Sequence, residues 1–410
     1  MPIVDPRARA RATWVLIGAR AGYAYNWFDI GPALPRIGAT FGVGPAEWGL
    51  LVAMFLVGAG AFQVPAGFLA RRYGARALSL WGLGLLAAAG ASGAFAPSFA
   101  WLLASRLVAG IGAALFFSPA IGLVGTLFPR GQRGVPVGAF SSAFSAGAAL
   151  ALIGTAVLVP IVDWRAALAL GGIGLGALTV LAIFAIPRAA GAPGPRPAAR
   201  RPMLPEALRF RGVWAIGLAF VGFEGATFAA SQFIVPFGEA IRGWSGVIAG
   251  TVGMMFVLPS VVGGPVGGSI AERYTNHRTQ LALVTLGGAA SLALVPFAGL
   301  AAAILVGSIF SFAYGFVYAV MYVIPHFWPS VPAEEIPLAI GLFNAIQLGG
   351  GALVSFGFGW LVSVRSYSVA WEAVAAVQAL TLVALFALPR TVSAGPRASA
   401  ESGPRAGLSP

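Results

Sequence analysis

The sequence predicts an all-α membrane protein with twelve transmembrane helices in two pseudo-symmetric six-helix bundles. Three observations predict this fold: the composition, a series of long apolar segments, and a motif that recurs in both halves. Of the 410 residues, 59% are hydrophobic and only 9% are charged. An ordinary soluble domain has roughly 25% charged residues, so this chain has too few charges to cover a surface that faces water.

The long apolar segments predict the number of membrane-spanning helices. A helix that crosses a bilayer needs about 20 apolar residues, and twelve segments meet this length. Their number excludes a lone signal peptide or a surface anchor, and none alternates with period two as a membrane β-barrel does. The expected spans lie near 13–36, 47–70, 77–96, 99–128, 134–160, 165–187, 212–237, 246–271, 279–298, 301–327, 336–363 and 368–388.

The basic residues predict the orientation. All 25 are arginines, and nineteen of them fall in loops and tails on one side of the membrane, against four on the other side. Short loops rich in arginine stay in the cytoplasm, so we expect a multi-pass protein of the inner cell membrane with both termini cytoplasmic. This topology accounts for the net charge of +13, and no nucleic-acid partner is expected.

Proline, glycine and arginine mark the expected domain boundaries. We expect an N-terminal bundle over 1–187, a flexible cytoplasmic linker over 188–211, a C-terminal bundle over 212–390 and a disordered tail over 391–410.

Missing residue types limit the chemistry. There is no cysteine or lysine and there are two histidines, which excludes thiolate metal sites, Schiff bases and a Walker A loop. We expect no metal, no cofactor and no enzymatic activity.

One short motif occurs twice. The chain reads GFLARRYGAR from Gly67 to Arg76 and GSIAERYTNHR from Gly268 to Arg278, an offset of 201 residues. Parallel six-helix repeats of this kind build secondary transporters whose site lies between the halves.

At these residues the sequence resembles the major facilitator superfamily. Gly67, Arg72, Gly74 and Arg76 match its signature after helix 2, although Arg71 replaces the usual acid, whereas the second copy keeps the acid as Glu272. Two further matches are Arg106, Gly110 and Gly112 in helix 4 and the pair Trp164-Arg165 after helix 5, while the helix 5 antiporter signature is absent from 138–150. The glycines let helix ends approach, and the arginines can pair with carboxylates or helix ends. The expected conformational latch comprises Gly67, Arg72, Gly74, Arg76, Gly268, Glu272 and Arg273.

Three ionisable residues inside the spans are expected to couple transport to protons, or alternatively to sodium. Charges at mid-bilayer are costly and therefore indicate function. Asp29 in helix 1 and Arg106 in helix 4 lie at similar depth, so we expect an ion pair; a static structural pair is the alternative. The resemblance implies that such a pair is often the coupling site. Glu224, at the middle of helix 7, is the alternative proton carrier.

A substrate pocket is expected among the cavity-lining helices 1, 4, 7 and 10 that the resemblance implies. Arg20 and Asp29 lie on opposite faces of a straight helix, and we expect the face with Asp29, Tyr25 and Asn26 to line the cavity. Arg20 either meets an anionic substrate or extends to the interface. The expected substrate-binding residues are Arg20, Tyr25, Asn26, Thr227, Tyr314, Tyr318, Tyr322, Asn344 and Gln347, and Ser141, Ser142 and Ser145 are further polar candidates.

These features favour a monomeric secondary transporter that moves a small solute by alternating access. Proton-coupled transport of an organic anion is the preferred interpretation. Efflux of amphipathic compounds or drugs is the alternative, and a membrane sensor or scaffold that transports nothing is the competing class. The expected partners are the solute, protons or sodium, and the lipid bilayer.

Overall fold

The structure is a computed structural model, and it describes residues 5–129, 132–188, 190–191, 211–273, 276–324 and 336–387. Most of the expected linker 188–211 and the whole expected tail 391–410 lie outside these residues. So does the side chain of Glu272, although its backbone is helical.

The described residues are almost entirely helical. The first half contains α1 (Pro6–Phe28), η1 (Gly31–Ala33), α2 (Leu34–Phe41), α3 (Pro45–Tyr73), α4 (Ala75–Ala94), α5 (Phe99–Leu127) and α6 (Gly134–Ala185). The second half contains α8 (Arg211–Arg242), α9 (Gly246–Met255), α10 (Ser260–Arg273), α11 (His277–Leu294), η2 (Val295–Phe297), α12 (Leu300–Val323), α13 (Ile336–Val364), α14 (Tyr367–Leu380) and η4 (Thr381–Ala387).

Ten helical stretches of the described residues are long and apolar enough to cross a membrane. One of them, α6, has 52 residues and is broken at Asp163, whose φ of 71° is not helical, so it provides two of the expected spans. The arginine-rich α1 corresponds to the first expected span. α1 is not among the ten candidate spans of the described residues, so the count of twelve stays a prediction, whereas the all-helical fold is confirmed.

The first span differs most from its expected range of 13–36. It begins earlier, because Pro6 occupies the first turn and the Asp5 side chain caps it through the Arg7 N–H. It also ends earlier, at Phe28, with Asp29 as its last capping residue. Pro32 follows within the short η1 turn, and proline cannot continue a regular helix.

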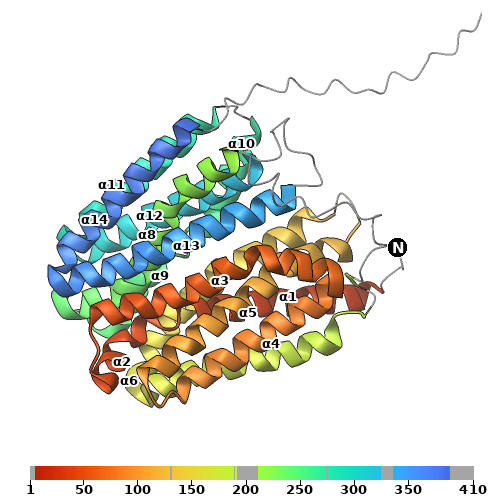
Figure 1. Cartoon of the computed structure of the whole chain (residues 1–410), viewed down its shortest axis with the longest axis horizontal. Helices are drawn as coiled ribbons and strands as arrows, with labels where there is room; N and C mark the ends of the chain where they lie inside the picture. The colour runs from red at the N-terminus through yellow and green to blue at the C-terminus, as the bar shows by residue number, and fades with distance from the viewer. Residues whose placement is uncertain are drawn as a thin grey trace, which may run out of the picture.

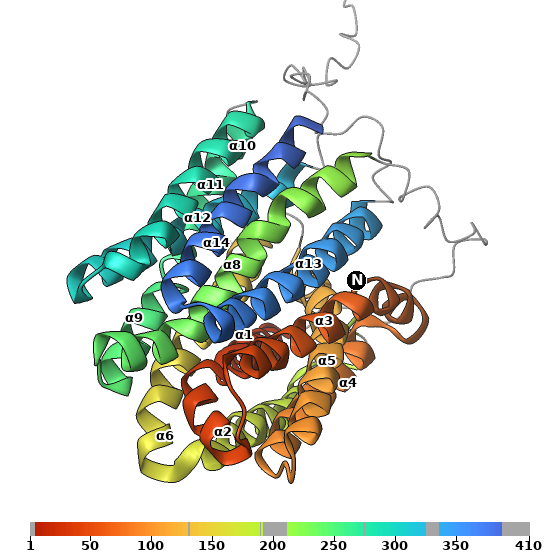
Figure 2. The ribbon, with the colours of Figure 1, turned by 60° about the vertical axis from the view of Figure 1, so that its left-hand side comes forward.

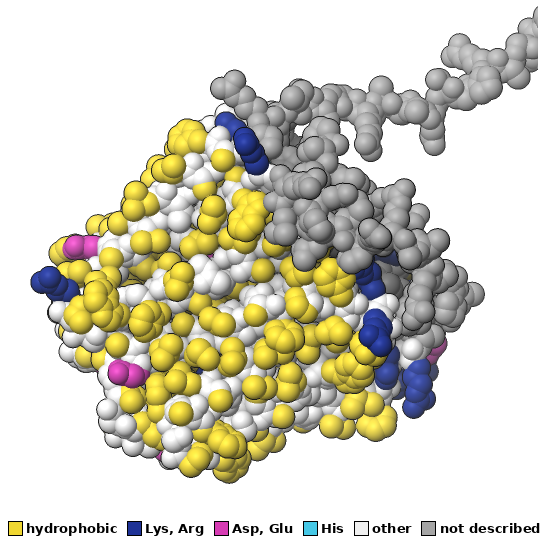
Figure 3. All heavy atoms as spheres, in the orientation of Figure 1, with side chains coloured by type: hydrophobic (Ala, Val, Ile, Leu, Met, Phe, Trp, Pro, Cys, Tyr) yellow, Lys and Arg dark blue, Asp and Glu magenta, His cyan; other side chains and the backbone are white. Residues whose placement is uncertain are grey.

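The two halves form separate helical bundles that lie side by side (Figures 1 and 2). One buried core is built from side chains between Ala12 and Ile186, with a few from the second half, and the other from side chains between Val213 and Leu385. The visible flank is covered with hydrophobic side chains, and the charged ones gather toward its ends (Figure 3). Such an apolar flank suits a lipid environment.

The two ends of the molecule differ in composition. The arginine-rich end is where α3 ends, α6 begins and α8 begins, near Arg71, Arg72, Arg133 and Arg211. The opposite end holds α2, the Asp163 break and the end of α13.

The halves are in close contact at the opposite end. A Cβ atom on Gly49 of α3 would lie 2.9 Å from the carbonyl oxygen of Ser355 in α13, and one on Gly359 of α13 would overlap the carbonyl of Pro45. On the α6–α9 side, a Cβ on Gly250 would lie 2.6 Å from Ala156. Small residues permit this backbone approach, and the opposite end is therefore closed.

Candidate functional site

A cavity of about 700 Å³ lies between the two halves. Its lining comes from α1, α3, α5 and α6 on one side and from α8, α10, α12 and α13 on the other. It continues to Val135, in the first turn of α6 at the arginine-rich end, where that side chain is 85% exposed. The cavity therefore opens toward the arginine-rich end and is closed by the tight contacts at the opposite end.

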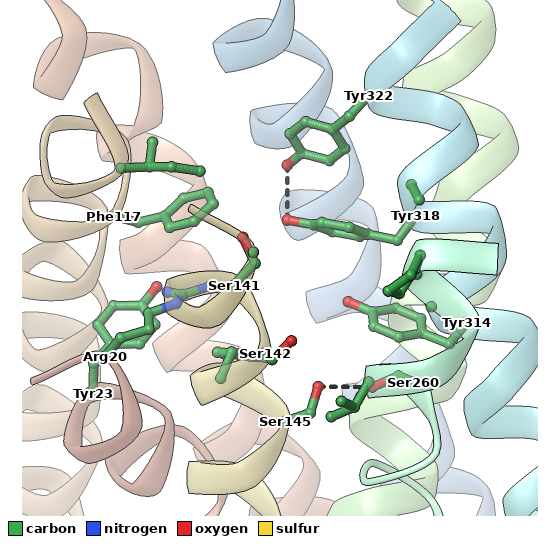
Figure 4. Close-up of a pocket in the computed structure, with 18 of the residues that line it drawn as sticks. Arg20, Tyr23, Phe117, Ser141, Ser142, Ser145, Ser260, Tyr314, Tyr318 and Tyr322 are labelled. Carbon is green, nitrogen blue, oxygen red and sulfur yellow. Dashed lines mark hydrogen bonds between the residues drawn. The ribbon is translucent and has the colours of Figure 1, made fainter. Parts of the chain in front are cut away.

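Arg20 is the cationic side chain of this cavity among the described residues. It is only 6% exposed, and its guanidinium carbon lies 4.5, 4.4 and 4.6 Å from the ring centroids of Tyr23, Phe117 and Phe144. Its Nε and Nη1 atoms have no hydrogen-bond partner. Figure 4 shows Arg20 and Tyr23 on the wall that faces the tyrosines of α12. Arg20 therefore faces the cavity and does not extend to the interface.

The face of α1 that lines the cavity is not the expected one. Tyr25 and Asn26 are absent from its lining. The Tyr25 hydroxyl bonds Thr155 of α6 at 3.1 Å, and the Asn26 amide donates to the carbonyls of Gly22 and Gly171. The prediction that this face lines the cavity is wrong, because it packs against α6 inside the first bundle.

Arg20, Tyr23 and Trp27 form the true cavity face of α1. Their i, i+3, i+7 spacing is that of one helix face, but the spacing alone does not distinguish this face from the one that carries Tyr25 and Asn26. Phe117, Phe144 and Gln63 also line the cavity without any sequence signal that distinguishes them from core residues.

The facing wall is a hydrogen-bonded group of polar side chains, and Tyr314, Tyr318, Tyr322, Asn344 and Gln347 line the cavity as predicted. The Tyr318 hydroxyl donates to that of Tyr322 at 2.9 Å, and Tyr322 donates to Asn344 Oδ1 at 2.6 Å. Gln347 donates to the same oxygen at 2.7 Å. The bonds fix the positions of these side chains.

Glu224 is the acidic side chain of the cavity among the described residues. It is 4% exposed and accepts a hydrogen bond of 3.0 Å from Tyr314. Thr227 does not line the cavity: its hydroxyl donates to the carbonyl of Phe223 in its own helix. Thr227 is therefore not part of the cavity wall in this conformation, and its contact with substrate stays a prediction.

Small polar side chains of α6 complete the cavity. Ser141, Ser142 and Ser145 all line it. Ser145 shares a hydrogen bond of 2.7 Å with Ser260 of α10 (Figure 4), which joins the two halves below the tyrosines.

Asp29 and Arg106 form the ion pair that the sequence predicted, with 3.5 Å between Oδ1 and Nη1. Both are buried, and neither lines the cavity. Arg106 also donates to the carbonyls of Asn26 at 2.9 Å and Trp27 at 3.3 Å, so it caps the last turn of α1. A cation is favourable at a helix C-terminus.

The carbonyl of Trp27 connects this pair to the second half. It accepts a second hydrogen bond, 2.9 Å long, from the buried side chain of Gln232 in α8. The rings of Phe28 and Phe228 stack beside it at 5.4 Å. A change in the Asp29–Arg106 pair therefore acts on a carbonyl that also bonds the other bundle.

The expected latch shows contacts within the first half. Arg76 donates to the carbonyls of Ile183 at 2.7 Å and Ile186 at 3.0 Å, at the end of α6. Arg72 and Arg273 are exposed. Atoms added at Gly67 or Gly268 would meet nothing within 4 Å, so the prediction that Gly67 allows a close helix approach is wrong here.

Gly74 is required for a different reason from the one expected. Its φ of 87° with ψ of 150° joins α3 directly to α4, a conformation that is almost restricted to glycine. Gly74→Ala is expected to lower the free energy of unfolding by about 1–3 kcal/mol. Gly67→Ala, seven residues earlier in open space, is the matched control and should leave the thermal melting temperature in detergent nearly unchanged. Equal melting of both variants would contradict this account.

Comparisons with known proteins agree with the fold. Residues 16–330 match the model of the Major Facilitator Superfamily. The structure resembles a bacterial homologue of the human lysosomal transporter Spinster in an inward-facing, occupied conformation, with a TM-score of 0.74 and 18% identity over 95% of this chain and 98% of that one. It also resembles a D-xylose-proton symporter, with a TM-score of 0.74 and 16% identity over 93% of this chain and 98% of that one.

Curated relatives are similar over part of their length. The niacin transporter NiaP of Acinetobacter baylyi is 31% identical over 129 residues, which is 32% of this chain and 29% of the relative. A probable nitrate/nitrite antiporter, NarK1 of Thermus thermophilus, is 26% identical over 66% of this chain and 63% of the relative. The chain therefore aligns with less than two thirds of the length of these relatives.

The family model covers most of the chain, and the bundles, the apolar flank and the cavity are consistent with it. The chain belongs to the Major Facilitator Superfamily, with the fold of a multi-pass membrane protein.

Proposed function

We propose that this transporter moves a small organic anion together with protons by alternating access. The observation that carries the proposal is Arg20, a buried guanidinium in the cavity with two nitrogen atoms that lack partners. A buried arginine without a counter-charge is costly, and an anionic solute supplies that charge. Two relatives named for nitrate/nitrite, NarK1 and the NarK2 of Mycobacterium tuberculosis, are consistent with an anionic substrate.

Proton coupling is assigned to Asp29 and Arg106. Arg106 stabilises the ionised carboxylate, and separation of the pair favours the protonated one. An ion drives a conformational change only if it binds one state better than the other. The shared carbonyl of Trp27 connects this pair to Gln232 of the other bundle.

The orientation and the latch are part of the same proposal. The arginine-rich end lies on the cytoplasmic side of the inner membrane, so this conformation is open inward. The bundles 1–187 and 212–390 rock about the cavity, and Arg72, Glu272 and Arg273 hold the arginine-rich end when it closes.

Efflux of amphipathic cations is the second candidate. Glu224 supports it, because this acid lies in a cavity with largely aromatic and aliphatic walls. A relative over 27% of the chain is named a methylenomycin A resistance protein.

Transport into liposomes with and without a pH gradient tests the proposal. With the purified chain reconstituted, an organic anion such as benzoate is expected to accumulate when the outside is acidic, and its entry is expected to alkalinise the outside. Empty liposomes are the control, because benzoic acid crosses lipid by itself. Anion movement no faster than in empty liposomes, with proton-driven movement of a cationic dye, would favour the second candidate.

A further inference from the structure

We propose that the solute is an aromatic monocarboxylate, whose carboxylate binds Arg20 and whose ring lies between the aromatic side chains of the two cavity walls. This inference rests on the proposed anion transport and makes it more specific. Charge, size and the chemistry of the walls each limit the solute.

The environment of Arg20 selects a planar anion with one negative charge. A guanidinium holds its N–H groups in its own plane, and the ring centroids of Tyr23, Phe117 and Phe144 lie 4.4–4.6 Å from its central carbon. Its Nε and Nη1 atoms are buried without a hydrogen-bond partner, and a carboxylate matches the geometry of guanidinium donors. Arg20 is the cation and Glu224 the acid of the described lining, so a second negative charge on the solute has no counter-charge.

The size of the cavity favours a ring over an inorganic anion. Its volume of about 700 Å³ falls within the range of roughly 300–1,000 Å³ that is typical of sites for small organic molecules. Nitrate or acetate fills only a small part of such a space. A solute with an apolar body next to its carboxylate fills more of it.

The walls select an aromatic body. Tyr314, Tyr318 and Tyr322 form a continuous row of tilted rings with centroid separations of 5.7 and 4.5 Å, and Figure 4 shows them on the wall facing Arg20 and Phe117. Aromatic rings favour offset or edge contacts with other rings. A sugar is a poor fit, because the hydroxyls of this wall already bond to Glu224, to Asn344 or to one another.

Binding of four simple probes to the purified full chain in detergent, measured by calorimetry, tests the substrate class. Benzoate is expected to bind roughly 2- to 10-fold more tightly than cyclohexanecarboxylate, because aromatic pairs add to the energy of simple burial. Acetate and neutral benzamide are expected to bind at least about 10-fold more weakly than benzoate, the first without the ring and the second without the charge.

Arg20→Gln is the matching change in the protein. It is expected to weaken benzoate binding at least about 10-fold, since charge-assisted hydrogen bonds are lost. Arg20→Lys keeps the charge and is expected to lose less. Arg11→Gln, an exposed arginine of the same helix, is the control and should bind as the unchanged protein does. Thermal melting of each variant identifies any that fail to fold.

The outcomes separate this inference from the function on which it rests. Equal binding of benzoate, cyclohexanecarboxylate and acetate, all dependent on Arg20, would overturn the aromatic class and leave anion transport standing. Benzoate binding that Arg20→Gln does not change would overturn the assigned site. Absence of binding by all three carboxylates would overturn both.

Discussion

Asp29→Asn is expected to abolish proton-driven accumulation of the solute while preserving its exchange across the membrane. With one proton per solute, a gradient of one pH unit supplies about 1.4 kcal/mol and supports at most about tenfold accumulation. Without a titratable group at position 29 the gradient no longer drives uptake through the protein, and accumulation falls to that of empty liposomes. The measurement compares gradient-driven uptake with counterflow of labelled solute in the same liposomes.

The variant is expected to fold, because asparagine keeps an oxygen at the same place. Arg106 still bonds to the carbonyls of Asn26 and Trp27, so its charge stays at the C-terminus of α1. Arg106→Ala is a harsher change, since loss of one partner from a buried ion pair costs about 3–5 kcal/mol.

Two controls distinguish the coupling site from its alternatives. Asp163→Asn makes the same chemical change at an exposed residue of the opposite end, where asparagine tolerates the positive φ, and should leave accumulation intact. Glu224→Gln should weaken transport without uncoupling it. Intact accumulation in Asp29→Asn with loss in Glu224→Gln would assign proton coupling to Glu224 instead.

The fold and the buried Asp29–Arg106 pair were predictable, because both depend on where apolar and charged residues occur along the chain. Helix length and apolar content fix how deep a residue lies, and the similar depths of Asp29 and Arg106 sufficed to pair them. The i, i+4, i+8 spacing of Tyr314, Tyr318 and Tyr322 likewise sufficed to place them on one face.

The orientation of α1 was not predictable by the same reasoning. A surface helix reveals its buried face by hydrophobic periodicity, but α1 is enclosed on both relevant faces. Tyr25 and Asn26 contact α6, whereas Arg20 and Trp27 contact the cavity. Both faces contain polar and aromatic residues, so residue type alone does not tell a cavity from a packing interface.

The sequence also did not show which glycines bring the two halves together. Gly67 and Gly268 belong to a recognisable motif, yet both face open space. The glycines that bring the two halves together, Gly49 and Gly359, belong to no motif. Only the three-dimensional packing of α3 against α13 shows their importance.

Gly359→Ala is therefore expected to open the opposite end. Its Cβ would overlap the carbonyl of Pro45 and lie 2.9 Å from Gly49 Cα, both of them backbone atoms that no rotamer change moves. Overpacking typically costs about 1–3 kcal/mol, and this cost falls only on the conformation in which α3 and α13 touch. The equilibrium should shift about 5- to 150-fold toward the state that is open at the opposite end.

Distances between spin labels measure this shift directly, because the chain contains no cysteine and labels attach only where cysteine is introduced. Ala39→Cys and Arg365→Cys place one label on each half at exposed positions of the opposite end. Gly359→Ala should increase the population with long distances, whereas Gly357→Ala, on the same helix with nothing within 4 Å, should not. If both variants gave the distances of the unchanged protein, the α3–α13 contact would not be what holds this end closed, and the closure would depend on the Trp27–Gln232 contact and on α6–α9 instead.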